Sequence, residues 1–155
     1  MSNIHEYNQD MTEILSTPEM QQTKNFVQHG KVSVFSHSVA VAMYSYRFAK
    51  KLKMKFDARS LIRGALLHDF FLYDWHDDWD KLHGFKHPKI ALENAVEKFD
   101  LNRRERDIIR KHMWPMTLIN IPKCKEAWVI CLIDKYCSIM ETFKIFKYNY
   151  HKEFI

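Results

Sequence analysis

Apolar residues recur at steps of three and four along most of the chain, which is the spacing of one face of an α-helix. The pattern is clearest over residues 34–53. Further helices are predicted at positions set by the same period and by glycine, proline and asparagine: residues 18–29, 58–68, 87–99, 102–114 and 123–143. No segment alternates convincingly between apolar and polar residues, so we expect an all-α fold.

One segment between the predicted helices lacks this period. Residues 70–84, with the sequence FLYDWHDDWDKLHGF, are predicted to form a loop. Pro88 suits the first turn of the helix that follows, because an N–H in that turn has no helical partner to lose. His87 then lies close to the start of that helix.

Composition agrees with a helical domain. The 155 residues include 46% hydrophobic residues but only three glycines and four prolines, which favours helices over a turn-rich β fold. No linker or repeat divides the chain. We expect a single compact domain over residues 1–155, with a core at roughly 28–140, a helical extension at the N-terminus and a basic, aromatic tail at the C-terminus.

Charge and cysteine usage bear on the ligands and the cellular location that we expect. The net charge of +5 is scattered, and it fits a small anionic ligand at least as well as a nucleic acid. The three cysteines form no CxxC pair, and no apolar N-terminal segment is present, so we expect a cytoplasmic protein with reduced thiols. No apolar run reaches the length of about 18 residues that spans a membrane. The oligomeric state stays open.

The sequence GALLHDFF (residues 64–71) places His68 and Asp69 side by side on apolar helix faces. Taking an unpaired carboxylate out of water is costly, so Asp69 requires a partner. Gly64, one turn earlier, would let another helix approach closely. A second His-Asp dipeptide begins at His76 in the predicted loop, so the dipeptide alone is not diagnostic.

Four more residues of metal-binding types fall on apolar helix faces by the same test: His37, His87, His112 and Asp134. A lone histidine on such a face is more often a hydrogen-bonded core residue than a ligand. Here two aspartates and four histidines lie on such faces, together with few lysines or arginines. Hydrogen bonds and salt bridges within the core would hardly provide partners for all six. A metal centre would neutralise both carboxylates and use neutral imidazoles directly, and we favour this interpretation.

The order of these residues resembles that of the HD superfamily of metal-dependent phosphohydrolases, over residues 28–140. The segments that carry the resemblance are SHSVAVAMYSYRFAK, LIRGALLHDF, KHPKIALENA, IIRKHMWP and ICLIDKYCSIME. The resemblance implies a helical HD-domain fold with two divalent metal ions and six ligands: His37, His68, Asp69, His87, His112 and Asp134. Asp69 would bridge the ions, and His83 is a competitor to His87.

The resemblance also implies a reaction. A hydroxide held by the ions would attack a small phosphorylated substrate, with His68 and Asp69 at the catalytic centre. The mixed nitrogen and oxygen ligands suit Fe, Mn, Co, Ni or Zn. Leu72 stands where some HD nucleotidases carry a catalytic carboxylate, so that variant of the mechanism is not supported. Of the HD enzymes, the pattern resembles diadenosine tetraphosphate hydrolases most.

The sequence leaves alternatives open for the residues that contact the substrate and for the function. Lysines that adjoin proposed ligands could contact a phosphate or simply be solvated: Lys86, Lys111 and Lys135. The leading function is hydrolysis of a small phosphoester or nucleotide. The alternatives are a diiron oxygenase, whose chemistry is known in the wider HD group, and a regulatory module in which the metal is structural. We do not expect a nucleic acid or a membrane as a partner.

Overall fold

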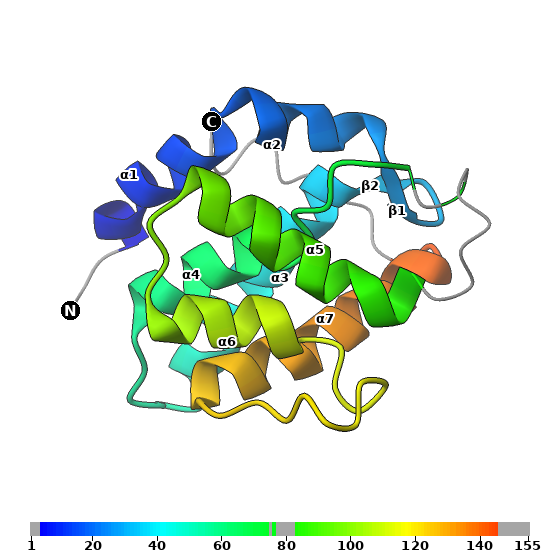
Figure 1. Cartoon of the computed structure of the whole chain (residues 1–155). Coiled ribbons are helices and arrows are strands. Elements are labelled where there is room, and N and C mark those ends of the chain that lie inside the picture. Colours follow the sequence, from blue (N-terminus) through cyan, green and yellow to red (C-terminus); the bar gives the residue numbers. More distant parts are fainter. Residues whose placement is uncertain (1–3, 75, 77–82, 146–155) are drawn as a thin grey trace.

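The computed structural model describes residues 4–74, 76 and 83–145, and most of their backbone is helical (Figure 1). The helices are α1 (Ile4–Leu15), α2 (Pro18–Gln22), α3 (Val34–Lys51), α4 (Ala58–Leu67), α5 (His83–Lys98), α6 (Arg103–Lys111) and α7 (Lys125–Thr142). A single 3-10 turn, Thr23–Asn25, follows α2. Two short strands, β1 (Val27–His29) and β2 (Val32–Ser33), pair as an antiparallel hairpin. The predicted all-α class is confirmed. Helix α1 lies in the N-terminal part of the chain, where the sequence analysis assigned no helix before residue 18.

The helix predicted over residues 18–29 is wrong in its second half. The chain leaves the α-helix after Gln22, and Val27–His29 forms strand β1. Gly30 has φ +60°, a backbone conformation that glycine adopts without steric cost, and it turns the chain into β2. Hairpins of this kind depend on contacts with the rest of the fold, which a local period does not record.

The start of α5 also differs from the prediction. The helix begins at His83, so Gly84 is helical and Pro88 lies inside the helix. The missing N–H of Pro88 leaves the carbonyl of Gly84 without its usual helical partner. Of the predicted loop, residues 70–74 are non-helical as expected, while residues 75 and 77–82 lie outside the described residues. The C-terminal tail from residue 146 also lies outside them.

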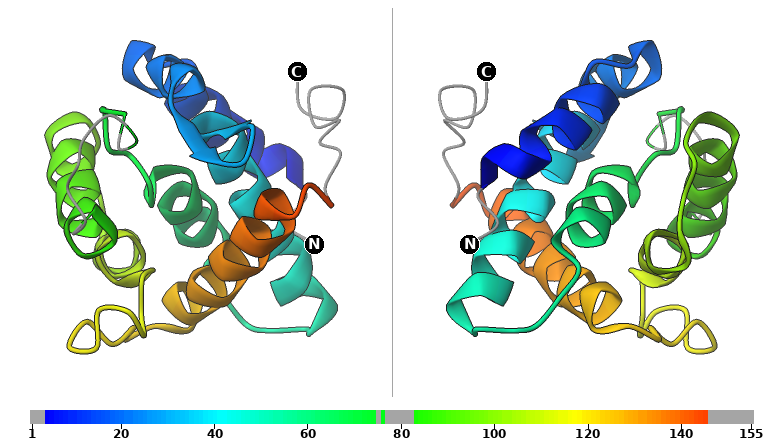
Figure 2. Two further views of the ribbon diagram at one scale, coloured as in Figure 1. Left: turned by 90° about the vertical axis from the view of Figure 1, so that its right-hand side faces the viewer. Right: turned by 90° about the vertical axis from the view of Figure 1, so that its left-hand side faces the viewer.

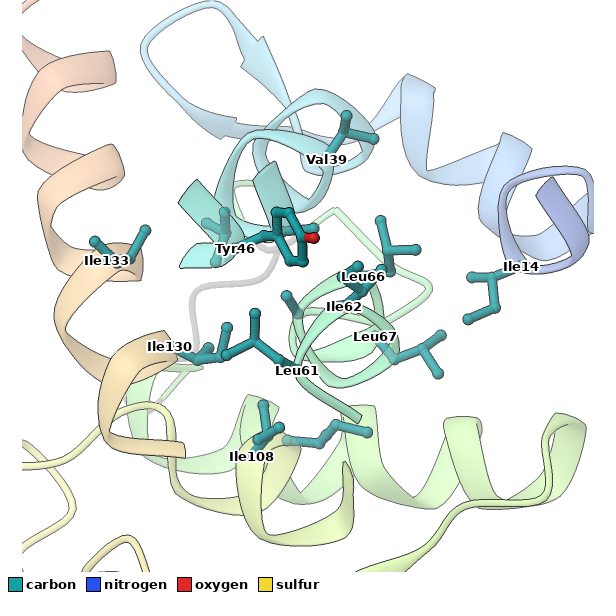
Figure 3. Close-up of a cluster of buried hydrophobic side chains, with 14 of the residues drawn as sticks. Ile14, Val39, Tyr46, Leu61, Ile62, Leu66, Leu67, Ile108, Ile130 and Ile133 are labelled. Carbon is teal, nitrogen blue, oxygen red and sulfur yellow. The ribbon is translucent and has the colours of Figure 1, made fainter. Parts of the chain in front are cut away.

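Helix α4 is the centre of the molecule. All of its residues except Arg59 are buried, and it contacts α1, α3, α5, α6 and α7. In Figure 2, α4 lies between the α5–α6 pair and α3. Figure 3 shows how its side chains fill the space between the surrounding helices: Leu61, Ile62, Leu66 and Leu67 lie among Ile14, Val39, Tyr46, Ile108 and Ile130. None of the described helices is both long and apolar enough to cross a membrane.

A buried ion pair joins α4 to the start of α6. Arg63 Nε donates to Glu105 Oε1 at 3.0 Å, and Arg63 Nη2 donates to the carbonyl oxygen of Asp100 at 3.0 Å. Glu105 also accepts from the backbone N–H of Asn102, which completes a capping box at the first turn of α6. The angle at which α6 leaves the loop is therefore tied to α4.

Gly64 sets how closely α4 and α6 approach. A Cβ atom at this position would lie 2.6 Å from Ile108 Cδ1 and 2.9 Å from Ile108 Cγ2. Real Cβ atoms are not found this close to other heavy atoms, so only glycine fits without movement. The close approach expected from the sequence is confirmed.

We expect Gly64→Ala to lower the free energy of unfolding by about 1–3 kcal/mol, the usual cost of overpacking a core. The higher helix propensity of alanine offsets only part of this cost. Urea denaturation followed by circular dichroism measures the change.

Gly84→Ala is the matched control for Gly64→Ala. Its Cβ would meet the Sδ atom of Met116 at 2.8 Å, which is the flexible end of a side chain that can move aside. We expect a change of less than about 1 kcal/mol for this variant. Equal losses in the two variants would contradict the role assigned to the contact between Gly64 and Ile108.

Candidate metal centre

The structure brings the six predicted ligands together in the interior. They come from the first turn of α3, the ends of α4 and α6, the second turn of α5 and the middle of α7, and all are buried: His37, His68, Asp69, His87, His112 and Asp134. They form two groups that share Asp69, and within each group one candidate ligand atom per residue lies within 4.8 Å of the others. The side chain of His83, the alternative to His87, lies outside the described residues.

Helices α4 and α6 each end at a histidine whose ring turns back onto its own helix. His68 Nδ1 lies 2.6 Å from the carbonyl oxygen of Ala65, and His112 Nδ1 lies 2.9 Å from that of Ile109. The last carbonyls of a helix lack N–H partners, so these bonds satisfy them. Because a carbonyl oxygen only accepts, each Nδ1 carries the proton, and Nε2 of the neutral ring is left with a lone pair.

His37 is oriented in the same way by a carboxylate. Its Nδ1–H donates to Glu141, with distances of 2.8 Å to Oε2 and 3.0 Å to Oε1. Its Nε2 atom faces the other side, 3.0 Å from Asp134 Oδ1 and 3.6 Å from Asp69 Oδ2. A carboxylate on the outer nitrogen of a ligand histidine is a common arrangement at protein metal sites, because it fixes the ring and raises its basicity.

The sequence analysis missed Glu141. It lies seven residues after Asp134, two turns along the same face of α7, and it is only 2% exposed. That spacing was a usable signal, because residues seven apart on a helix share a face.

The two oxygens of Asp69 face different histidines. Asp69 Oδ2 lies 3.3 Å from His68 Nε2. Asp69 Oδ1 lies 3.2 Å from His87 Nε2 and 3.3 Å from His112 Nε2. Those two histidine nitrogens are themselves 2.9 Å apart. A carboxylate with one oxygen toward each group of nitrogens is placed to bridge two cations.

The pKa values report the electrostatics of this cluster. Burial raises the pKa of Asp69 and of Asp134, but the neighbouring histidines hold both well below the usual range. Burial lowers the pKa of His37, yet its bonds to Asp134 and Glu141 raise it to about 9. Burial lowers the pKa of His112 below its usual value. The carboxylates thus stay ionised and require positive charge beside them.

A divalent cation fits this donor set. His68 Nε2 and Asp69 Oδ1 are buried and have no hydrogen-bond partner among the described residues. A cation between the imidazole lone pairs and the carboxylates would satisfy both atoms and separate His87 Nε2 from His112 Nε2. Mixed imidazole and carboxylate donors suit first-row transition metals and zinc.

The three candidate lysines have different surroundings. Lys111 Nζ lies 2.6 Å from Asp107 Oδ1 in the preceding turn of α6. Lys135 Nζ donates to the carbonyl oxygens of His112 at 2.8 Å and of Cys131 at 3.2 Å. Lys86 is exposed. Contact between a phosphate and any of them stays a prediction.

The hairpin adds two residues that the sequence analysis missed. Gln28 Nε2 lies 2.6 Å from Asp69 Oδ2. The ring of His29 packs edge-on against that of His37, with centroids 5.4 Å apart. No signal in the sequence marked either residue, because this segment was predicted to be helical.

Comparison with known proteins places the cluster in a family. The family model described as HD domain matches residues 34–139. Searches of curated proteins and of solved structures gave no match. The matched segment covers well over half of the chain and contains all six predicted ligands, in the order that the family resemblance implies. The chain therefore belongs to the HD domain family, a metal-dependent hydrolase-type family whose members are mostly phosphohydrolases.

Proposed function

We propose that this protein is a phosphohydrolase that uses two divalent metal ions to cleave a small phosphoester or nucleotide. The observation that carries the proposal is the direction of the imidazoles. The Nδ1–H groups of His37, His68 and His112 are all engaged on the outer side of the cluster. Their Nε2 atoms therefore converge on the buried carboxylates of Asp69 and Asp134, which suits a cation and not an apolar core.

In this proposal the two groups hold one ion each and share Asp69. The first ion takes the set that contains both aspartates: His37, His68, Asp69 and Asp134. The second takes Asp69, His87 and His112. Three protein ligands are typical of a metal site that also accepts water or substrate, whereas four are typical of a closed site. The second ion is thus the better placed to meet a substrate.

When bound, divalent ions would supply two effects here: a lower pKa for a bound water and neutralisation of the charge that develops on a phosphoryl group. The residues of the chain would position these ions. Asp69 holds the two sites at a fixed separation, and Glu141 fixes the ring of His37. Because both aspartates are buried, bulk water does not screen their charge. Of the candidate metals, Fe, Mn, Co, Ni and Zn all suit these donors.

Asp69→Asn tests the shared carboxylate. The amide keeps the size of the side chain but removes the negative charge that both sites require. We expect the variant to retain less than one ion per chain, where the wild type retains two, by elemental analysis after growth with manganese or cobalt. We also expect wild-type stability to rise by about 2.7 kcal/mol at 100 times the dissociation constant, and the variant to show no such rise.

Glu93→Gln is the control for this substitution, because it removes an exposed carboxylate whose partner is Lys89 on the same face of α5. It should bind metal as the wild type does. If Asp69→Asn kept two ions per chain, Asp69 would be a structural residue. One ion per wild-type chain would reduce the proposal to a single-metal site.

His112→Ala tests the reaction. We expect the turnover of a generic phosphodiester or of a nucleotide to fall by about 100-fold, because a poorly held second ion misplaces the reacting phosphoryl group. The fold should persist, because the substitution removes one bond to the carbonyl oxygen of Ile109 and leaves the apolar core cluster intact. Released phosphate or nucleotide is measured with Mn, Co or Fe present, and circular dichroism checks the fold.

His76→Ala is the matched control, because His76 also belongs to a His-Asp dipeptide but is exposed. It should keep wild-type turnover. Oxygen consumption by the iron-loaded protein, without phosphoester turnover, would support the oxygenase alternative instead. Inactivity of the metal-loaded wild type in both assays would support a regulatory module.

A further inference from the structure

The hairpin of β1 and β2 touches the candidate metal centre although both of its strands lie outside the segment matched by the HD domain. Three consecutive residues make the contacts. Gln28 bonds to Asp69, His29 packs on His37, and a Cβ atom at Gly30 would lie 3.1 Å from the carbonyl oxygen of Glu141. The hairpin therefore belongs to the surroundings of the centre, and its contribution is not part of the family pattern.

The contact of Gln28 is the most specific of the three. Its side chain is buried, with a residue exposure of 6%, and Nε2 lies 2.6 Å from Asp69 Oδ2. An ionised carboxylate only accepts hydrogen bonds, so the NH₂ end of the amide faces Asp69 and donates. The amide oxygen, Gln28 Oε1, is buried and has no hydrogen-bond partner within the described ranges. Burying it without a partner costs stability, which indicates a role other than folding.

The donor acts on a carboxylate whose orientation matters. The terminal torsion of an aspartate is broad, so the plane of its carboxylate is set by its partners. Gln28 occupies one side of Oδ2, while His68 Nε2 faces the same oxygen at 3.3 Å. With Oδ2 held there, Oδ1 points to His87 and His112.

We propose that Gln28 is a positioning residue of the metal centre, whose amide holds Asp69 in the orientation that bridges the two ions. This inference rests on the proposed two-metal function. The second group has three protein ligands against four in the first, so it depends more on Asp69 Oδ1. Loss of Gln28 should therefore weaken the second ion more than the first.

The hairpin is held firmly enough for this role. Gly30 has φ +60° and packs directly on the backbone at Glu141, so the turn cannot move toward α7. The backbone N–H of Val34 donates to the carbonyl oxygen of Phe26 at 2.8 Å, which ties the strand to the first residue of α3. Gln28 thus reaches Asp69 from a support joined to the helices of His37 and Asp134.

Cobalt titration of Gln28→Leu tests the inference, with the visible absorption of bound Co²⁺ as the signal. The wild type should bind two ions. In Gln28→Leu we expect the affinity for the second ion to fall by about 10–100-fold, the usual effect of removing a group that orients a ligand, with a smaller change for the first. Gln22→Leu, at an exposed glutamine of α2, is the control and should titrate as the wild type does.

Two further variants keep the test decisive. Gln28→Asn retains an amide that is too short to reach Asp69, and it should show the same weakening if Gln28→Leu does not fold. Gln28→Glu cannot donate when ionised and should also weaken the second ion. Tighter Co²⁺ binding by Gln28→Glu would instead make this position a direct ligand and overturn the positioning role.

Failure of this inference is distinct from failure of the proposed function. If the wild type binds two Co²⁺ ions and both Gln28→Leu and Gln28→Asn bind them equally well, the role of Gln28 is refuted and the two-metal centre stands. If the wild type binds no Co²⁺ at all, the proposed function itself is refuted, and the inference with it.

Discussion

The centre depends on which nitrogen of each histidine faces inward. Three rings donate their Nδ1–H groups to acceptors outside the cluster, so three Nε2 atoms face ionised carboxylates in a buried space. Without a proton or a metal ion, each of these nitrogens would present a lone pair. Lone pairs and carboxylates repel one another, and burial removes the water that would otherwise screen them. The arrangement becomes favourable only with positive charge between the groups, supplied by protons or by metal ions. The rest of the fold holds the histidines and carboxylates in this arrangement, which would otherwise be unfavourable.

The close contact between α4 and α6 joins folding to this geometry. Gly64 and Ile108 meet at the contact, and the next residue on each helix is Ala65 or Ile109, whose carbonyl oxygen accepts the Nδ1–H of His68 or His112. The separation of the two helices therefore sets the separation of the two rings. The apolar contact at Gly64 therefore aligns the two rings from one helical turn away. This explains why such a position belongs to the site although it carries no side chain.

Sequence reasoning identified the six candidate ligands, all of them buried, because each lies on or directly after a helix whose apolar period distinguishes the inner face from the outer face. The family resemblance supplied their order and pairing. The same reasoning did not find the hairpin, because a strand of three residues is too short to show a period. Gln28 was therefore assigned to a helix. Glu141 was missed for a different reason. It shares a helix face with Asp134, but a glutamate in the last turn of a helix usually faces solvent, and here the packing of α7 against α3 and the hairpin encloses it beside His37. Both misses are residues that orient a ligand, and their positions are decided by tertiary contacts.

The two halves of the centre are supported unequally. Gln28 holds Asp69, the carboxylate that the two halves share, and the first half is braced further by Glu141 on His37. In the second half, His112 is held by its bond to Ile109 on α6, whereas His87 depends on α5, whose Asn94 Nδ2 donates to the carbonyl oxygen of Phe70 at 3.0 Å. If the centre holds two ions as proposed, the ligands of the first would be the more firmly placed, and those of the second would have more freedom to adjust to a substrate. The asymmetry comes from the helices that carry the ligands, and it would persist whichever transition metal is bound.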